Sequence, residues 1–240
     1  MTNYPQDFRT QKVISFMVIA AIGLVAGFDI LSATIGIGQV IDSTRIFHLD
    51  NGKPVSVWLA IQSITLIFKF LLFLASGILF LVWLNRANKN LASLQPQHVE
   101  FSSGWAVGWW FVPFAALIKP FQVVREVWWE SDPDRSGDQT FLTSSLHSAP
   151  AYMGFWWAAW ITTNILDNIS FRVFDAESLS VVKVTGLLFA AAAITSFVAG
   201  ALAIYLVLDV TKRQNERFRR LYPAQPGYTP PPNLGKYGEI

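Results

Sequence analysis

Residues 101–129 read FSSGWAVGWWFVPFAALIKPFQVVREVWW, and this stretch decides how many times the chain crosses a membrane. Its uncharged part, 101–118, is slightly short for a span, because a helix needs roughly 20 apolar residues to cross about 30 Å of hydrocarbon. Pro113 lies within it, and a proline inside a helix costs about 3 kcal/mol unless neighbours satisfy the freed carbonyl. We therefore expect a re-entrant or interfacial segment on the cytoplasmic side, with both possibilities open.

The second half of this stretch predicts an amphipathic helix that begins after Pro113. Apolar side chains recur at helical spacing, and polar ones occupy the opposite face. Arg125 falls within the apolar stripe, where its stem can be buried while the guanidinium reaches a headgroup or an aromatic ring. The tryptophans suit the headgroup boundary of a bilayer. The stripe comprises Phe114, Leu117, Ile118, Phe121, Val124 and Trp128, and the polar face comprises Lys119, Gln122, Glu126 and Glu130.

The composition is that of a multi-pass membrane protein. Of 240 residues, 52% are hydrophobic and only 14% are charged, whereas soluble domains carry about 25% charged residues. The charge deficit is concentrated in long uncharged runs. The chain has no cysteine, which excludes disulfides and thiolate metal sites, and its net charge of +2 gives no reason to expect nucleic-acid binding.

Four segments are long and apolar enough to span, which predicts an all-α fold. They are approximately 13–35, 55–84, 148–168 and 183–208. The first follows Arg9 and Lys12 without a nearby cleavage site and is expected to be an uncleaved signal anchor. Lys and Arg concentrate in the segments that lie inside if residues 1–12 are cytoplasmic. We therefore expect a protein of the plasma (inner) membrane with both termini in the cytoplasm.

The C-terminal part is expected to contain a basic juxtamembrane segment, 209–221, and a disordered proline-rich tail, 222–240. Near an anionic leaflet each basic residue contributes about 1 kcal/mol of binding. The candidate lipid-headgroup contacts are Lys212, Arg213, Arg217, Arg219 and Arg220.

Four polar residues within the expected spans form a candidate intramembrane cluster: Asp29, Lys69, Asn164 and Asp167. Counted along straight helices, all four lie in the outer third of the bilayer. Ionisable groups at such depths are costly and are functional hypotheses by default. Three possibilities stay open: an Asp29–Lys69 pair that fixes helix register, unpaired groups that reach the interface, and a solute or ion site. The glycines of GIG at 36–38 are interpreted as a loop signal.

The run WLNRANKNLASL (83–94), followed by 101–129, resembles the signature of the family called domain of unknown function 4328 (DUF4328). The resemblance implies a small multi-pass protein of the bacterial plasma membrane and no known activity. Arg86 and Lys89 in the first run are expected to be topology anchors, or to contact headgroups or Glu126 and Glu130. The positions that match the family pattern, all of unknown role, are Trp83, Arg86, Asn90, Trp105, Trp109, Pro113, Pro120, Arg125 and Glu126.

No catalytic motif is found, and no cofactor or metal site is expected. His48, His98 and His147 are scattered without metal-ligand spacing. Asp29 and Asp167 could form an aspartyl dyad, but neither lies in a protease motif. We expect a non-enzymatic accessory or scaffold protein that binds the anionic cytoplasmic leaflet, and a protein partner or a second copy. The alternative is a small-solute or ion pathway through the intramembrane polar residues.

Overall fold

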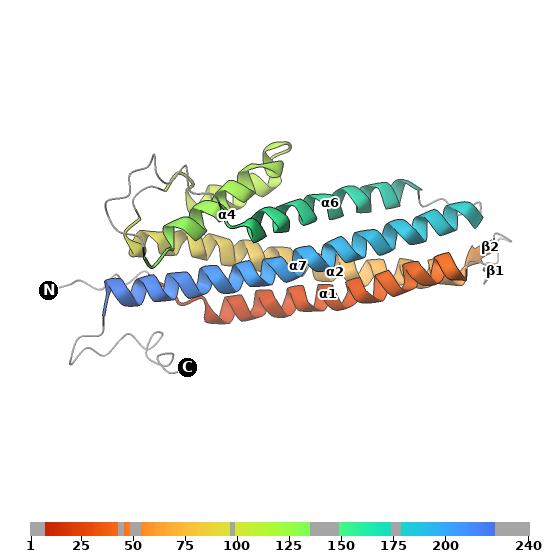
Figure 1. The fold of residues 1–240 in the computed structure, drawn as a ribbon, viewed down its shortest axis with the longest axis horizontal. Coiled ribbons are helices and arrows are strands. Elements are labelled where there is room, and N and C mark those ends of the chain that lie inside the picture. The colour runs from red at the N-terminus through yellow and green to blue at the C-terminus, as the bar shows by residue number, and fades with distance from the viewer. Residues whose placement is uncertain are drawn as a thin grey trace. The chain divides into compact units, whose positions relative to one another are not determined.

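The computed structural model describes residues 8–42, 46–48, 54–96, 99–134, 149–173 and 179–223. Within these residues, long helices dominate (Figure 1): α1 (Lys12–Ile41), α2 (Val57–Leu91), α6 (Ala151–Val173) and α7 (Leu179–Leu221). The all-α expectation omitted a short antiparallel hairpin of β1 (Ile46–His48) and β2 (Pro54–Ser56). The expected tail 222–240 lies outside the described residues beyond Pro223.

Three of the helices extend past the apolar runs that predict them. α1 continues to Ile41, so that Gly36 and Gly38 lie inside a helix, and interpreting GIG as a loop was wrong. α2 continues to Leu91, and α7 carries the basic segment as an uninterrupted helix to Leu221. The reason is that Lys, Arg, Gln and Glu are good helix formers, so a helix need not end where the apolar run ends.

Three helical segments are both long and apolar enough to cross a membrane: Lys12–Ile41, Ala60–Leu94 and Ser180–Leu221. Their length and apolarity indicate a membrane-embedded protein. The fourth expected span, 148–168, corresponds to α6, which is about 35 Å long but is not among the three. Polar residues in its second half, from Thr162 to Asn168, lower its apolarity.

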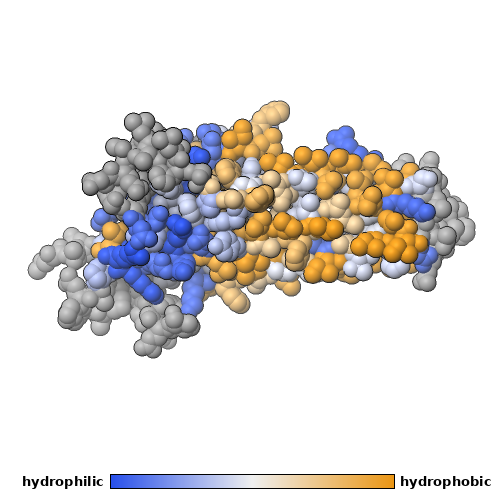
Figure 2. Space-filling view, in the orientation of Figure 1, coloured by the Kyte–Doolittle hydropathy of each residue, from blue (hydrophilic) through white to orange (hydrophobic). Residues whose placement is uncertain are grey.

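The chain divides into two compact units. Unit 1 consists of Met1–Val18, Ile78–Pro150 and Tyr205–Ile240, and unit 2 consists of Ile19–Gly77 and Ala151–Ile204. The helices α1, α2 and α7 contribute a segment to each unit. In the face that Figure 2 shows, hydrophobic residues cover most of unit 2, and hydrophilic residues gather on unit 1 around the end of α7.

The stretch 101–129 folds into short pieces within unit 1. α3 (Ser103–Gly108) continues into a single 3-10 turn, a second 3-10 turn follows, and α4 (Lys119–Glu130) completes the stretch. The Ser102 side chain accepts a hydrogen bond from Trp105 N and caps α3. Pro120 lies in the first turn of α4, where its missing N–H costs nothing. The longest piece, α4, has 12 residues, about 18 Å, and is too short to span.

The expected faces of α4 need correction. Phe114, Leu117 and Ile118 precede the helix and are exposed, so they do not belong to its buried stripe. Arg125 is exposed rather than embedded among apolar side chains. The buried face instead carries Glu130, because Val123, Val127 and Glu130 follow at spacings of four and three. Its members are Pro120, Val123, Val124, Val127 and Glu130.

Candidate functional site

Gln214 on α7 is the centre of a buried hydrogen-bond network in unit 1, and its side chain is only 1% exposed. Its Oε1 accepts hydrogen bonds from Gln11 Nε2 at 2.5 Å and from Asn90 Nδ2 at 3.2 Å. Its Nε2 donates to the carbonyl of Ala87 at 2.9 Å and to Ser131 Oγ at 3.1 Å. Both donor and both acceptor positions of the amide are therefore used. This single side chain ties the start of α1, the end of α2, α7 and the residue after α4 together.

Two positions of the family pattern, Asn90 and Trp83, make further buried hydrogen bonds in unit 1. Asn90 holds both backbone groups of Arg9: its Oδ1 accepts from Arg9 N at 3.1 Å, and its Nδ2 donates to Arg9 O at 2.9 Å. Trp83 is fully buried and its Nε1 donates to Thr211 Oγ1 at 3.4 Å. The same hydroxyl lies 2.9 Å from Ser15 Oγ. These positions hold the first segment of the chain against α2 and α7 within unit 1.

Arg217 is buried, and its guanidinium is used internally. It donates to the carbonyls of Leu94 at 2.8 Å and Gln95 at 3.3 Å, and also to the carbonyl of Asp132. Backbone carbonyls that end a helix or turn lack partners of their own, and a buried arginine with its five N–H groups can satisfy several at once. The expectation that Arg217 contacts lipid headgroups was therefore wrong.

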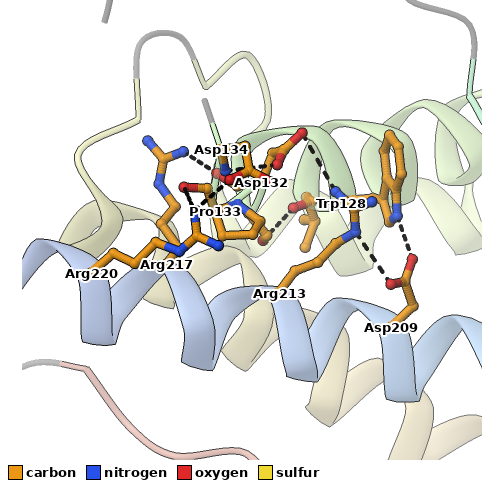
Figure 3. A network of polar contacts seen from close by, with 10 residues as sticks. Trp128, Asp132, Pro133, Asp134, Asp209, Arg213, Arg217 and Arg220 are labelled. Atoms are coloured by element: carbon orange, nitrogen blue, oxygen red, sulfur yellow. Dashed lines mark hydrogen bonds and ion pairs between the residues drawn. The ribbon is translucent and has the colours of Figure 1, made fainter. Parts of the chain in front are cut away.

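Arg213 and Asp209 form a second internal cluster with Trp128 of α4. Figure 3 shows both residues reaching from α7 toward Trp128. The Trp128 Nε1 donates to Asp209 Oδ2 at 2.6 Å, and Arg213 Nε donates to Asp209 Oδ1 at 3.2 Å. The Arg213 guanidinium lies 4.0 Å from the Trp128 ring centre and 3.6 Å from Asp132 Oδ2. Arg213 is thus also engaged within the protein.

The other basic residues of this segment lie nearer the surface. Arg220 pairs with Asp134, and Lys212 lies 3.8 Å from Glu216 with about three quarters of its side chain exposed. Arg219 is exposed as well. Pairs at this exposure contribute little to stability, and contact with lipid headgroups stays a prediction for these three residues.

Glu126 of α4 binds the backbone of the segment that connects α2 to α3. Its carboxylate accepts hydrogen bonds from Glu100 N at 2.8 Å and Phe101 N at 3.2 Å. Burial raises the pKa of Glu126 above its ordinary 4.5, although the two N–H bonds act in the opposite direction. Arg86 is half-buried, and its Nε has no hydrogen-bond partner among the described residues; Lys89 is exposed.

Between α3 and α4 the chain presents four large exposed side chains, Phe111, Phe114, Leu117 and Ile118, which we call the aromatic tip. Phe114 is 87% exposed and has a φ of 61°. The hydrogen bond from Ala115 N to Pro113 O, 2.7 Å long, closes a γ-turn around it. A γ-turn with positive φ is rare and strained, and a bulky side chain at its centre adds to the cost. Such strain is typical of positions retained for function.

In unit 2, Asp29 of α1 and Lys69 of α2 form an ion pair. Lys69 Nζ lies 2.7 Å from Asp29 Oδ1, and both side chains are largely buried. Asp167 of α6 is close enough to Lys69 for an attractive charge interaction and to Asp29 for a repulsive one. Asn164 does not join them, because it is exposed and donates to Trp160 O of its own helix. No group of side chains that could hold a metal occurs among the described residues.

The sequence analysis missed Gln11, Asp209 and Gln214, the main internal partners of unit 1. Their partners lie as many as 203 residues away along the chain, so spacing carries no sign of them. One signal was present. Asp209 and Gln214 lie on the same helix as Arg213 and Arg217, which were assigned to lipid on charge alone.

A family model described as Domain of unknown function (DUF4328) matches residues 53–212. The chain belongs to this family. The match confirms the resemblance found in the sequence and covers two thirds of the protein, from β2 into α7. The DUF4328 region excludes α1, yet Asn90 and Lys69 within it bind Arg9 and Asp29 outside it. No curated protein and no solved structure matches the chain.

Proposed function

We propose that this DUF4328 protein is a non-enzymatic accessory or scaffold protein of the plasma membrane. In this proposal α1, α2, α6 and α7 all cross, both termini are cytoplasmic, and unit 1 lies at the cytoplasmic surface with the aromatic tip in the lipid interface. The observation that carries the proposal is the tip itself: four large apolar side chains exposed around a strained turn. Contiguous exposed apolar patches mark protein or membrane interaction sites.

Hydrogen bonds hold the residues on both sides of the aromatic tip in place, which favours docking. Glu126 fixes the backbone before α3, and Trp128 fixes α4 to Asp209 on α7. Lys119, at the start of α4, lies over the rings of Phe101 and Trp109, at 5.2 and 5.8 Å. A side chain presented from a held base loses little conformational entropy when it binds. The aromatic tip therefore has a defined conformation before it binds.

Basic side chains add attraction to an anionic leaflet. Lys89, Arg125, Lys212 and Arg219 are exposed in unit 1, and near such a leaflet each contributes about 1 kcal/mol. Apolar insertion and charge attraction are the two terms by which interfacial segments bind membranes. The proposal assigns the first term to the tip and the second to these residues.

Depth measurement tests the lipid contact. The chain has no cysteine, so Phe114→Cys can carry a single environment-sensitive fluorophore in nanodiscs. We expect nitroxides near the top of the acyl chains to quench this label and aqueous iodide to spare it. Asp134→Cys, an exposed polar position of the same unit, is the matched control and should show the reverse. Equal iodide quenching at both positions would contradict lipid docking.

Photo-crosslinking tests the scaffold role. A photoreactive amino acid at Arg125, exposed on α4, should give a discrete adduct with a second protein or a second copy in native membranes. The same amino acid at Val123, buried on the opposite face, should give none. A chain recovered without adducts from the Arg125 variant would argue against an interaction protein.

A further inference from the structure

Two helices of unit 2 bury polar side chains along matching stripes. On α1, Asp29, Ser32 and Gln39 follow at spacings of three and seven, which places them on one face. On α2, Trp58, Gln62 and Lys69 follow at four and seven. We call these six residues the polar seam. Ser32, Gln39 and Gln62 are at most 2% exposed.

α1 and α2 run antiparallel and meet near both ends of these stripes. At one end Lys69 Nζ meets Asp29 Oδ1 at 2.7 Å. At the other end a Cβ built on Gly38 would lie 3.1 Å from the Trp58 ring. Asp29 and Gln39 are separated by roughly 15 Å along α1, and Lys69 and Trp58 by about 16 Å along α2. Ser32, Gln39 and Gln62 therefore lie between two fixed contacts.

The seam contains more hydrogen-bonding capacity than the protein uses. Ser32 Oγ, Trp58 Nε1 and both polar atoms of the Gln39 and Gln62 amides have no partner among the described residues. Buried polar groups in proteins are nearly always bonded to protein or to ordered water. Hydrocarbon offers no partner either. Ordered water is the partner that buried polar groups commonly use where the protein offers none.

The packing of α7 against α1 makes room for one of these amides. A Cβ on Gly186 would lie 2.8 Å from Gln39 Cβ and 2.9 Å from Gln39 Oε1, and a Cβ on Gly36 would lie 2.5 Å from Gly186 O. Only glycine fits at these two positions, and glycine weakens a helix interior. The two glycines thus leave space for the buried amide of Gln39. An apolar side chain would be usual at such a position.

The end of the seam at Asp29 is a cluster of three ionisable groups. Lys69 forms an ion pair with Asp29 and lies within electrostatic reach of Asp167. Ser196 of α7 is the further polar group that faces Asp29. Ionisable groups in a low-dielectric setting are costly unless a partner or water reaches them.

We propose that the polar seam is a water-filled inlet. It leads from the end of unit 2 at Gly38 and Trp58 to the Asp29–Lys69–Asp167 cluster, and its ligand is a file of water with the protons that water carries. This inference stands apart from the proposed interaction role, because it concerns unit 2 alone. It names the route and the ligand for the alternative function, a solute or ion pathway.

Thiol accessibility tests the inlet directly. Ser32→Cys is nearly isosteric and introduces the chain's first thiol. The probe is Ag⁺, an ion small enough to enter a water-filled path, and it is applied to both faces of native membrane vesicles. The thiols that have not reacted are then counted with a maleimide after denaturation in SDS. Thiols react as thiolates, which form in water and not in lipid or a dry core. We expect Ser32→Cys to react at least tenfold faster than two controls.

The controls bracket the seam. Val25→Cys lies on the same face of α1, one turn beyond Asp29, and is buried; Ile30→Cys is on the outer face of α1. A Ser32→Cys rate as slow as that of Val25→Cys would overturn the proposal. Adding Gln39→Leu should close the inlet and slow the Ser32→Cys reaction toward the control rate. It removes unpaired amide groups, so folding should not suffer. An unchanged rate in that double variant would also overturn the proposal.

Discussion

Gln214 illustrates how much a single buried amide can hold, because its side chain makes four hydrogen bonds within unit 1. Gln214→Ala would leave the buried Gln11 Nε2 without this acceptor, at about 1–3 kcal/mol, whereas Asn90 and Ser131 each keep another hydrogen bond. The cavity left by the shortened side chain adds to this cost, and we expect a loss of about 3 kcal/mol in the free energy of unfolding. Denaturant titration of the detergent-purified protein measures it. Lys212→Ala, two residues away and exposed, should change this energy by less than about 0.5 kcal/mol; similar losses in both variants would contradict the assigned role.

Residues of the two units differ in how far the sequence could place them. Asp29 and Lys69 lie in long apolar runs, and a helix of fixed rise converts their positions into depths, so their meeting could be anticipated. Gln11 and Gln214 lie at the ends of such runs and are 203 residues apart. Depth alone does not orient side chains around a helix axis. Their contact depends on which faces of α1 and α7 pack, and only the folded unit shows that.

Glu126 gives a prediction about pH. Burial raises the pKa of the folded-state carboxyl above 4.5. At pH values between the unfolded and the folded pKa, the folded state therefore binds more protons than the unfolded state. Stability contributed by the protonated form is present below pH 4.5 and is lost as the pH rises through the folded pKa. Glu126→Gln cannot ionise, and we expect a flatter dependence of the melting temperature on pH above 4.5. Parallel curves for the two proteins would show that Glu126 does not titrate in this window.

At the scale of elements, the stretch 101–129 was predicted to break near Pro113, and it does so for the reason given, since no helix continues through that residue. The turn itself was not foreseen. Helical periodicity was extended back to Phe114 and Leu117, whereas the backbone around Phe114 forms a γ-turn. Periodicity reports where apolar residues recur and not whether the backbone between them is helical. A non-glycine residue at positive φ leaves no pattern in the sequence.

Phe114→Gly separates the stability of this turn from its proposed use. Glycine adopts positive φ without the steric cost of a Cβ, so relieving the strain should raise the free energy of unfolding by about 0.5–1 kcal/mol. The same change removes the most exposed aromatic group of the tip. We expect a more stable protein in which a fluorophore at Leu117→Cys becomes more accessible to aqueous iodide. Phe111→Gly, at a position with ordinary backbone, should weaken docking without the gain in stability. A destabilised Phe114→Gly protein would mean that the side chain makes structural contacts.

At the scale of the whole molecule, the count of crossings rests on α6. Three helices have the apolarity of ordinary spans, whereas α6 carries Asn164, Asp167 and Asn168 within 23 residues. Its length suffices, and Asp167 interacts with the charges of α1 and α2 in unit 2. A polar residue costs less in a span when it faces a partner than when it faces lipid. We expect α6 to cross for this reason, since composition does not register where a polar group points.

Reporter fusions show whether the chain crosses the membrane an even or an odd number of times. If α6 crosses, a fusion after Asp134 lies in the cytoplasm and one after Ala176 lies outside, and the C-terminus returns to the cytoplasm. If α6 does not cross, the first two fusions report the same side, and a reporter at Ile240 lies opposite the N-terminus. We expect the first pattern, because it keeps the basic residues of 212–220 inside, as the distribution of Lys and Arg requires. A cytoplasmic reporter that is active after Ala176 and inactive after Ile240, with good expression of both, would remove the fourth crossing. It would also put unit 1's end of α7 on the outer face, where the anionic leaflet that the proposed docking needs is absent.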